Sequence, residues 1–170
     1  VTADNIAKKY SISREDQDAF AYASQQKAIA AIDSGRFQDE IVPVEVPGRK
    51  GSVTVFDTDE HPNRASTPEK LAKLRPAFTK DGTVTAGNAS GINDGASFTI
   101  IASEDAVKKH NLTPLAEVIG IGQGGVDPRV MGLGPTPAIL HALKYADLCI
   151  EDMELVELNE AFAAQSLGVI

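Results

Sequence analysis

The alternation of apolar and polar positions divides the chain into a first part with one long helix and a second part in which apolar runs alternate with helices. Ser13, followed three residues later by Asp16, has the pattern of a capping box and predicts a helix to about Ile32. Gly35 then supplies a helix stop. Thr2 is expected to cap a shorter helix before this one.

Two short β-type runs follow, at 41–46 and 51–56, and the turn residues between them predict a hairpin. Pro43 has no N–H donor, so the first strand should lie at the edge of its sheet. Thr67 and Pro68 then have the pattern of a cap and a first helical residue, and they predict a short helix to about Leu74.

The second part alternates predicted strands and helices, which favours an α/β fold. Apolar runs at 97–102, 115–121 and 154–158 are read as strands, and helices are expected after Ser103, after Pro135 and at the C-terminal end. The stretch 83–96 consists almost entirely of small residues, which would let its backbone approach a partner closely.

Composition limits the classes of function. The chain has 170 residues, 42% of them hydrophobic, which suits one domain or two small ones. A net charge of −8 disfavours nucleic acid and anionic membranes as partners. No apolar run approaches the roughly 20 residues of a membrane span. The single cysteine, Cys149, excludes an internal disulfide and fits a reducing compartment, so a cytoplasmic location is expected.

Asn159 stands where the last predicted strand leads into the last predicted helix. Ligands collect at such strand ends in α/β folds, and a helix N-terminus adds free N–H groups. An amide there could orient a water or a carbonyl oxygen. Asn is also a common helix cap, and the local pattern by itself favours that simpler role.

Other candidate sites carry weaker signals. Residues 120–125 fit G-x-G-x-x-G, but Pro128 rather than a helix start follows, so we interpret them as a tight glycine connection instead of a dinucleotide site. Between Arg64 and Arg75 four basic residues face one Glu; this is either a phosphate-binding patch or a solvated helix face. Cys149 is expected to be a buried, inert thiol and His141 a packing residue, and no metal site is predicted.

Four blocks of the sequence, taken together, resemble the thiolase family. They are, in chain order, Ala72-Lys73-Leu74-Arg75-Pro76-Ala77-Phe78, the stretch from Val84 to Ala96, Val130-Met131-Gly132-Leu133-Gly134-Pro135, and Asn159-Glu160-Ala161-Phe162-Ala163. The order is that of the family, the resemblance covers essentially the whole chain, and the acetyl-transferring bacterial type is the most similar.

The resemblance implies an acyltransferase that condenses two acetyl-CoA into acetoacetyl-CoA and CoA, and that catalyses the reverse thiolysis. Coenzyme A thioester would be a substrate, with no separate cofactor, and the parent enzyme would be a homotetramer. Asn159 matches the family's asparagine, which holds a water that forms an oxyanion hole with a histidine; each such donor is typically worth about 3–4 kcal/mol. With this resemblance, the functional interpretation of Asn159 outweighs the cap.

Further matches concern coenzyme A. Ser90 matches the serine that bonds the pantetheine amide. Residues matching the pantetheine and acyl pocket are Leu74, Phe78, Ala86, Met131, Ala161 and Phe162, each of which could also be plain core. Arg64 is the nearest match to the arginine beside the adenine, although Asn63 stands closer to the expected position.

The resemblance also implies a layered fold of which this chain is an internal piece. Residues 1–91 would be the lid, or loop, domain, 92–112 the closing strand and helix of the N-terminal half, and 113–170 the start of the C-terminal half. The family's cysteine nucleophile, GHP histidine and second cysteine are not found in these residues. The chain alone is therefore expected to be inactive; the alternatives are a coenzyme-A-binding module without catalysis and a nucleotide-dependent oxidoreductase.

Overall fold

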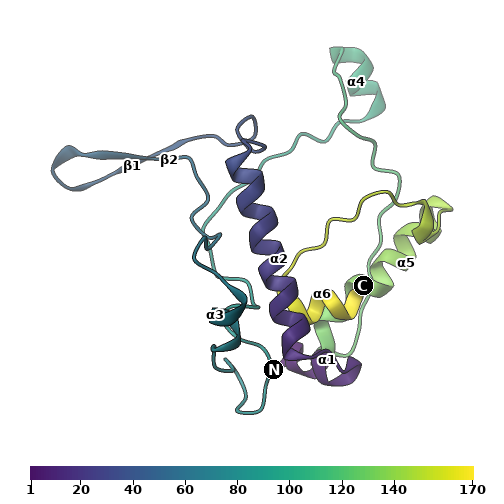
Figure 1. The fold of residues 1–170 in the computed structure, drawn as a ribbon. Helices are drawn as coiled ribbons and strands as arrows, with labels where there is room; N and C mark the ends of the chain where they lie inside the picture. Colours follow the sequence, from purple (N-terminus) through teal and green to yellow (C-terminus); the bar gives the residue numbers. More distant parts are fainter.

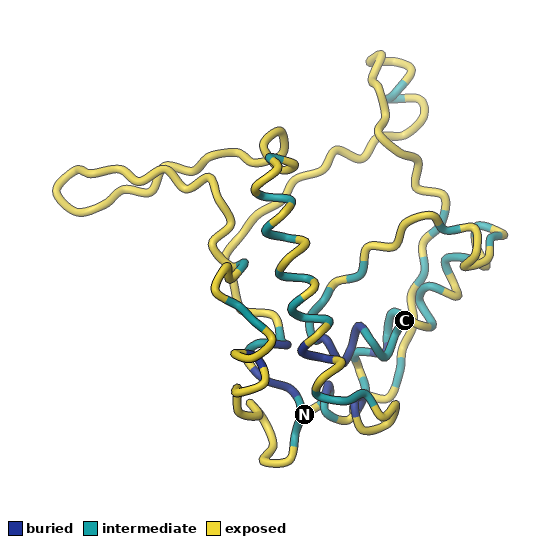
Figure 2. The backbone as a smooth tube through the Cα atoms, in the orientation of Figure 1, coloured by how far each residue is buried: buried dark blue, intermediate teal, exposed yellow.

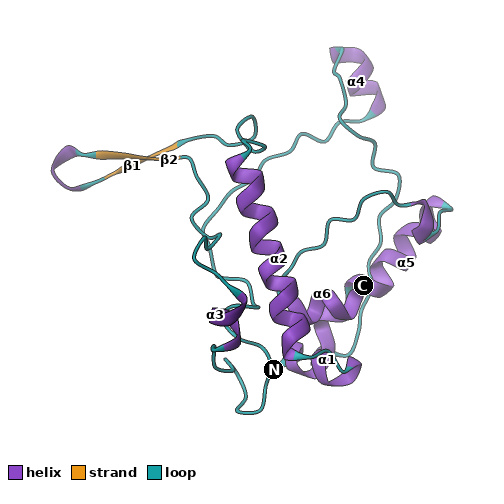
Figure 3. Cartoon of the chain, viewed as in Figure 1, coloured by secondary structure: helices purple, strands orange, loops and turns teal.

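The computed structural model describes all of residues 1–170 as short helices, one hairpin and long extended connections (Figures 1 and 3). The α-helices are α1 (Thr2–Tyr10), α2 (Arg14–Asp33), α3 (Pro68–Ala72), α4 (Glu104–His110), α5 (Pro135–Ala146) and α6 (Ala163–Val169). Strands β1 (Val44–Pro47) and β2 (Val53–Phe56) form the sheet, and 3₁₀ turns are η1 (Arg49–Gly51), η2 (Pro128–Leu133) and η3 (Ile150–Asp152).

The long helix α2 begins as the sequence predicts. The Ser13 hydroxyl accepts a hydrogen bond from the Asp16 backbone N–H at 3.0 Å, and the Asp16 carboxylate accepts one from the Ser13 N–H at 3.3 Å. Gly35 follows the helix end with a φ of +71°, a conformation that suits glycine. The expected cap at Thr2 is wrong, because α1 already begins at this residue and Val1 occupies the cap position without a side-chain hydrogen bond.

The predicted hairpin is confirmed as an antiparallel pair. Its register runs from Val44 opposite Phe56 to Pro47 opposite Val53, so β1 starts immediately after Pro43 rather than before it. Every residue of both strands is exposed. The hairpin extends away from the helices as an arm (Figure 1).

The three other expected strands are wrong for this structure. Residues 97–102, 115–121 and 154–158 are not strands, and no backbone hydrogen bond links them to another segment. Their apolar side chains face solvent, as with Phe98 at 94% and Leu155 at 88% exposure. A strand exists only through a hydrogen-bonded neighbouring strand, and no extended segment of residues 1–170 pairs with any of these three. The layered sheet expected from the sequence is therefore not formed within residues 1–170.

The core is small and lies where α1, α6, η2 and the segment 84–89 meet. Its centre consists of Ala3, Ala7, Val84 and Ala164, and Phe162 is among the residues that pack against it. Only 14 of 170 residues are buried, and they cluster in this region (Figure 2). The site residues around position 88 and position 162 are thus attached to the best-packed part of the molecule.

The glycine motif at 120–125 serves close contact with a helix. A Cβ at Gly120 would lie 2.8 Å from the Ala142 carbonyl oxygen, and one at Gly122 would lie 1.9 Å from that of Ala138. These alternate glycines face α5, so the segment is an extended chain laid against that helix, not the tight connection we expected. No helix starts directly after it, because the next helical turn begins at Pro128. The structural requirement of a dinucleotide site is therefore not met.

None of the helices is long and apolar enough to cross a membrane.

The contact between Gly122 and α5 can be tested with Gly122→Ala. The added Cβ overlaps the α5 backbone, so we expect α5 to detach more often, at a cost of about 1–3 kcal/mol, or roughly 5- to 150-fold faster amide exchange in α5. Hydrogen exchange with mass spectrometry measures this effect. Gly125→Ala is the matched control, since a Cβ there meets nothing within 4 Å. Equal exchange in the two variants would contradict the close contact.

Candidate functional site

Two segments that are far apart in the sequence pair with each other at the proposed site. The Ser90 N–H donates to the Ala161 carbonyl oxygen at 2.9 Å, and the Ala163 N–H donates to the Asn88 carbonyl oxygen at 2.9 Å. Ala89 and Phe162 form an antiparallel bridge between these bonds. The pairing joins the small-residue block that contains Ser90 to the block that contains Asn159, as a shared site requires.

A buried polar network holds the first of these segments. Asn88 is 3% exposed, and its amide donates to the Asp18 carboxylate at 2.9 Å and to the Thr83 carbonyl oxygen at 3.1 Å. The amide oxygen accepts from the Thr85 N–H at 2.8 Å. Asp18 in turn forms an ion pair with Arg14 at 2.8 Å. The backbone before Ser90 is therefore fixed to the start of α2 through side chains that are largely buried.

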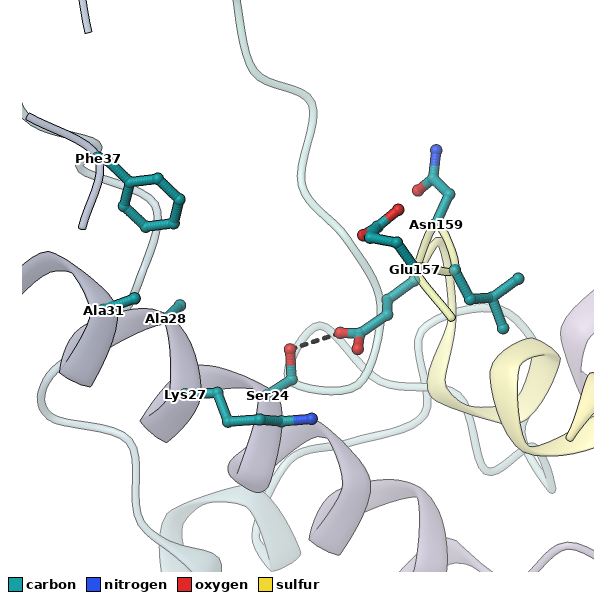
Figure 4. A pocket seen from close by; sticks show the side chains of 9 residues that line it. Ser24, Lys27, Ala28, Ala31, Phe37, Glu157 and Asn159 are labelled. Atoms are coloured by element: carbon teal, nitrogen blue, oxygen red, sulfur yellow. Dashed lines mark hydrogen bonds between the residues drawn. The ribbon is translucent and has the colours of Figure 1, made fainter. Parts of the chain in front are cut away.

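Asn159 lies on the rim of a pocket of about 580 Å³ between α2 and the chain that leads into α6 (Figure 4). The lining residues are Ser24, Lys27, Ala28, Ala31, Phe37, Glu157, Leu158, Asn159 and Glu160. Ala28 and Ala31 of α2 are thus part of the pocket wall. Asn159 does not cap α6, since Phe162 is the N-cap residue, so the simpler role considered for this amide is wrong. Its side chain extends away from α2 in Figure 4, and Ser90 is not among the lining residues.

Several of the residues matched to the pantetheine pocket come together beside this pairing. The Phe78 and Phe162 rings meet edge to face with centroids 6.4 Å apart. A Cβ at Gly87 would lie 2.6 Å from Leu74 Cδ1, so Leu74 packs against the residue that follows Ala86. Phe78 and Leu74 are 54% and 38% exposed, which leaves apolar surface open close to the paired segments. Such surface suits the apolar part of a ligand.

Met131 lies on η2 and is less closely associated with the group. It is 66% exposed. The neighbouring Gly132 packs on α6, because a Cβ there would lie 2.7 Å from Gln165 Cγ. The contact between η2 and α6 is thus made beside Met131, through Gly132.

Arg64 is held by an acidic partner near the far end of α2. Its guanidinium donates two hydrogen bonds to the Asp33 carboxylate, at 2.9 and 2.6 Å. These bonds, together with the charge of Arg64, lower the pKa of Asp33 below its ordinary value. The side-chain oxygen of Asn63 accepts a hydrogen bond from the Ala65 N–H at 3.0 Å. The Arg64 guanidinium and the Asn63 side-chain oxygen are therefore both already engaged in hydrogen bonds.

The remaining candidates show no catalytic arrangement. Cys149 is exposed, so its expected burial is wrong; the residues around it form a surface turn, and its thiol donates to the Asp152 carboxylate at 3.0 Å. That hydrogen bond raises the pKa of the Cys149 thiol, which disfavours the reactive thiolate. His141 is exposed on α5 rather than packed, with Nδ1 at 2.5 Å from the Gln123 carbonyl oxygen. No three His, Cys, Asp or Glu side chains gather as metal ligands.

Sequence reasoning missed the residues that hold the site in place. Ser24 donates to the Glu160 carboxylate at 2.5 Å, and Asp18 accepts from Asn88. Both polar residues lie on α2 within a run dominated by alanine and other small or polar side chains. Asp18 follows Arg14 by four residues, a spacing typical of a helix ion pair, but this spacing carries no information about the buried partner Asn88. The sequence contains no local signal for a contact 136 positions away.

Comparisons with known proteins agree with the resemblance. The family model "Thiolase, N-terminal domain" matches residues 1–105, and "Thiolase, C-terminal domain" matches residues 112–170. The "Acetyl-CoA acetyltransferase" of Thiocystis violacea is 59% identical over 169 residues, which are 99% of this chain and 43% of that protein. The chain thus spans less than half the length of this relative.

Solved structures give the same result. The Bacillus anthracis acetyl-CoA acetyltransferase superposes with a TM-score of 0.96 at 50% identity, over 99% of this chain and 42% of the other. Human mitochondrial 3-ketoacyl-CoA thiolase in complex with CoA superposes with a TM-score of 0.92 at 56% identity, over 99% of this chain and 41% of the other. With both family models in chain order and both structures matched across nearly all of its residues, the chain belongs to the thiolase family and corresponds to the end of the N-terminal and the start of the C-terminal thiolase domain.

Proposed function

We propose that residues 1–170 supply the coenzyme-A-binding surface and the Asn159 amide of a thiolase-type acyltransferase. The reaction is the Claisen condensation of two acetyl-CoA to acetoacetyl-CoA and CoA, together with the reverse thiolysis. The observation that carries the proposal is the pairing of residues 88–90 with 161–163. It places the serine matched to pantetheine binding one short segment away from the amide matched to the oxyanion hole.

The division of roles follows from the chemistry of the residues. The exposed Phe78 and Leu74 offer an apolar surface for the pantetheine chain, and Ser90 is exposed and can hydrogen-bond its amide. An amide N–H at Asn159, acting directly or through a water, would stabilise the negative oxygen of the acetyl-CoA enolate. The nucleophile and the proton-transfer groups that the family uses have no counterpart among residues 1–170.

The acetyl preference is proposed from the Thiocystis violacea and Bacillus anthracis relatives, both of which are named acetyl-CoA acetyltransferases. The tetrameric state and the cytoplasmic location remain parts of the proposal, and the human relative is mitochondrial by name. The boundaries at 91 and 112 are proposed on the same basis. The second candidate function is a coenzyme-A-binding module without catalysis, favoured by the exposed apolar surface close to the paired segments and the raised pKa of the one thiol.

The first prediction of the proposed function concerns activity. The 170-residue chain should show no thiolysis of acetoacetyl-CoA above the uncatalysed rate, because its only thiol has a raised pKa and no histidine beside it. A spectrophotometric assay of acetoacetyl-CoA loss with added CoA measures this. Turnover that disappears on thiol alkylation would refute the prediction and identify Cys149 as a nucleophile.

The second prediction concerns binding. The chain should bind CoA, and Ser90→Ala should weaken the affinity about 2- to 10-fold, the equivalent of one neutral hydrogen bond. Isothermal titration calorimetry gives both dissociation constants. Ser52→Ala at the hairpin tip is the matched control, since that hydroxyl bonds only the Arg49 carbonyl oxygen. Absence of any CoA binding would remove the module alternative, and equal affinity in Ser90→Ala would remove the role of Ser90.

The third prediction concerns the Arg64–Asp33 pair, which must open before Arg64 can contact an anionic ligand. Arg64→Gln should raise the pKa of Asp33 back towards its ordinary value of 3.8. Because the folded-state pKa is lowered, the pair stabilises the fold above that ordinary value and loses its effect as the pH falls through the lowered one. The pair is exposed, so the change in stability should be small.

Side-chain carboxyl NMR titration tests this third prediction. Arg129→Gln is the control: it should release Asp127, whose pKa is lowered to about 2 by Arg129, and leave Asp33 unchanged. An Asp33 titration that is identical with and without Arg64 would show that the pair does not persist in solution.

A further inference from the structure

Within residues 1–170, few contacts hold the segment that carries Asn159. Residues 154–160 make no backbone–backbone hydrogen bond, and the first such bond after them is the one accepted by the Ala161 carbonyl. Asn159 is itself exposed. A side chain on such a segment keeps a fixed direction only if another contact restrains the chain next to it.

One contact provides this restraint. The Ser24 hydroxyl donates to the Glu160 carboxylate at 2.5 Å, and this is the one side-chain hydrogen bond made by residues 154–160. Ser24 and Glu160 are both partly buried. The bond therefore ties the residue directly after Asn159 to the middle of α2.

Helix α2 is a firm support for this contact. It has 20 residues, a capping box at Ser13 and an ion pair between Arg14 and the buried Asp18. The same Asp18 accepts a hydrogen bond from Asn88, next to the paired segment. Both halves of the proposed site are thus attached to one helix, through Asp18 on one side and Ser24 on the other.

The directions of the two neighbouring side chains complete the argument. The hydrogen bond from Ser24 holds the Glu160 carboxylate against α2. In Figure 4 the Asn159 amide extends away from the helix. Successive side chains of an extended chain point to opposite sides. Holding Glu160 against α2 consequently fixes the side on which Asn159 presents its amide.

We propose that Ser24 is a positioning residue which, through Glu160, orients the Asn159 amide for the oxyanion of the thioester reaction. This inference rests on the proposed function of Asn159. Neither Ser24 nor Glu160 needs to contact the substrate. The hydroxyl should therefore affect the rate of the chemical step far more than the binding of CoA.

The test uses a complete enzyme in which residues 1–170 replace the matching part of the Bacillus anthracis acetyl-CoA acetyltransferase. Ser24→Ala and Glu160→Ala should each lower kcat for thiolysis about 10-fold and change the KM for CoA less than twofold. The double variant should be no slower than either single one, because both remove the same contact. Ser24→Thr keeps the hydroxyl and should restore most of the rate. Ser34→Ala, at the C-terminal end of α2, is the control.

The outcomes separate this inference from the proposed function. If Asn159→Ala slows the chimera but Ser24→Ala does not, the positioning role is wrong and the proposed function stands. If Asn159→Ala leaves kcat unchanged, the oxyanion role fails whatever Ser24 does. A loss in Ser24→Ala that Ser24→Thr does not restore, or that appears in KM rather than in kcat, would also overturn the inference.

A second measurement on the 170-residue chain does not depend on the chimera. In the nitrogen-15 labelled chain, Ser24→Ala should change the chemical shifts of the Asn159 side-chain amide and broaden its resonances. Ser34→Ala should leave these resonances unchanged. The Ser34 hydroxyl bonds only the Ala31 carbonyl oxygen at 3.1 Å. Identical Asn159 resonances in the wild type and in Ser24→Ala would overturn the inference.

Discussion

The buried hydrogen bonds of Asn88 are the interaction on which the rest of the site depends. This one amide side chain joins the carboxylate of Asp18, the carbonyl of Thr83 and the N–H of Thr85. Its own backbone carbonyl accepts from Ala163, where α6 begins. Because Asn88 is buried, each lost partner would leave a costly unpaired polar group, which favours this arrangement over alternatives. Helix α2, residues 83–88 and the start of α6 are positioned relative to one another by that arrangement.

The hydrogen bonds of Asn88 also explain why the segments around it can be held in place with little burial of apolar side chains. The core around Ala3, Ala7 and Val84 is built mainly from small side chains. Small residues let the backbones of two segments approach closely, and the directional hydrogen bonds then determine the relative position of those segments. The Phe78 and Phe162 rings can therefore remain partly open on the outer side without loosening the segments that carry them. The proposed binding surface is therefore exposed, while buried contacts hold the segments that carry it.

Local signals in the sequence predicted what local physics determines. The capping box at Ser13, the cap at Thr67, the start of α4 at Ser103 and the hairpin all follow from contacts within a few residues, and the structure has each of them. The expected strands failed because a strand is defined by a neighbour that a single apolar run does not specify. The glycines at 120–124 were misread for a related reason, since their spacing of two encodes a helix packed alongside rather than a turn. The contacts of Ser24 with Glu160 and of Asp18 with Asn88 could not be predicted, because the residues around Ser24 and Asp18 in the sequence give no information about a distant partner.

The β1–β2 hairpin has a practical consequence. Both faces of the hairpin carry apolar side chains, yet none of them is buried. At the tip, Arg49–Gly51, the chain turns with Lys50 in the left-handed conformation. A two-stranded ribbon without a covering layer adds little to the stability of the remaining fold. Extra residues inserted at this tip, such as an epitope tag or a fluorophore-labelled peptide, should be accommodated without disturbing the helices. The arm is accordingly the natural place to attach a reporter when the region around Asn159 must stay untouched.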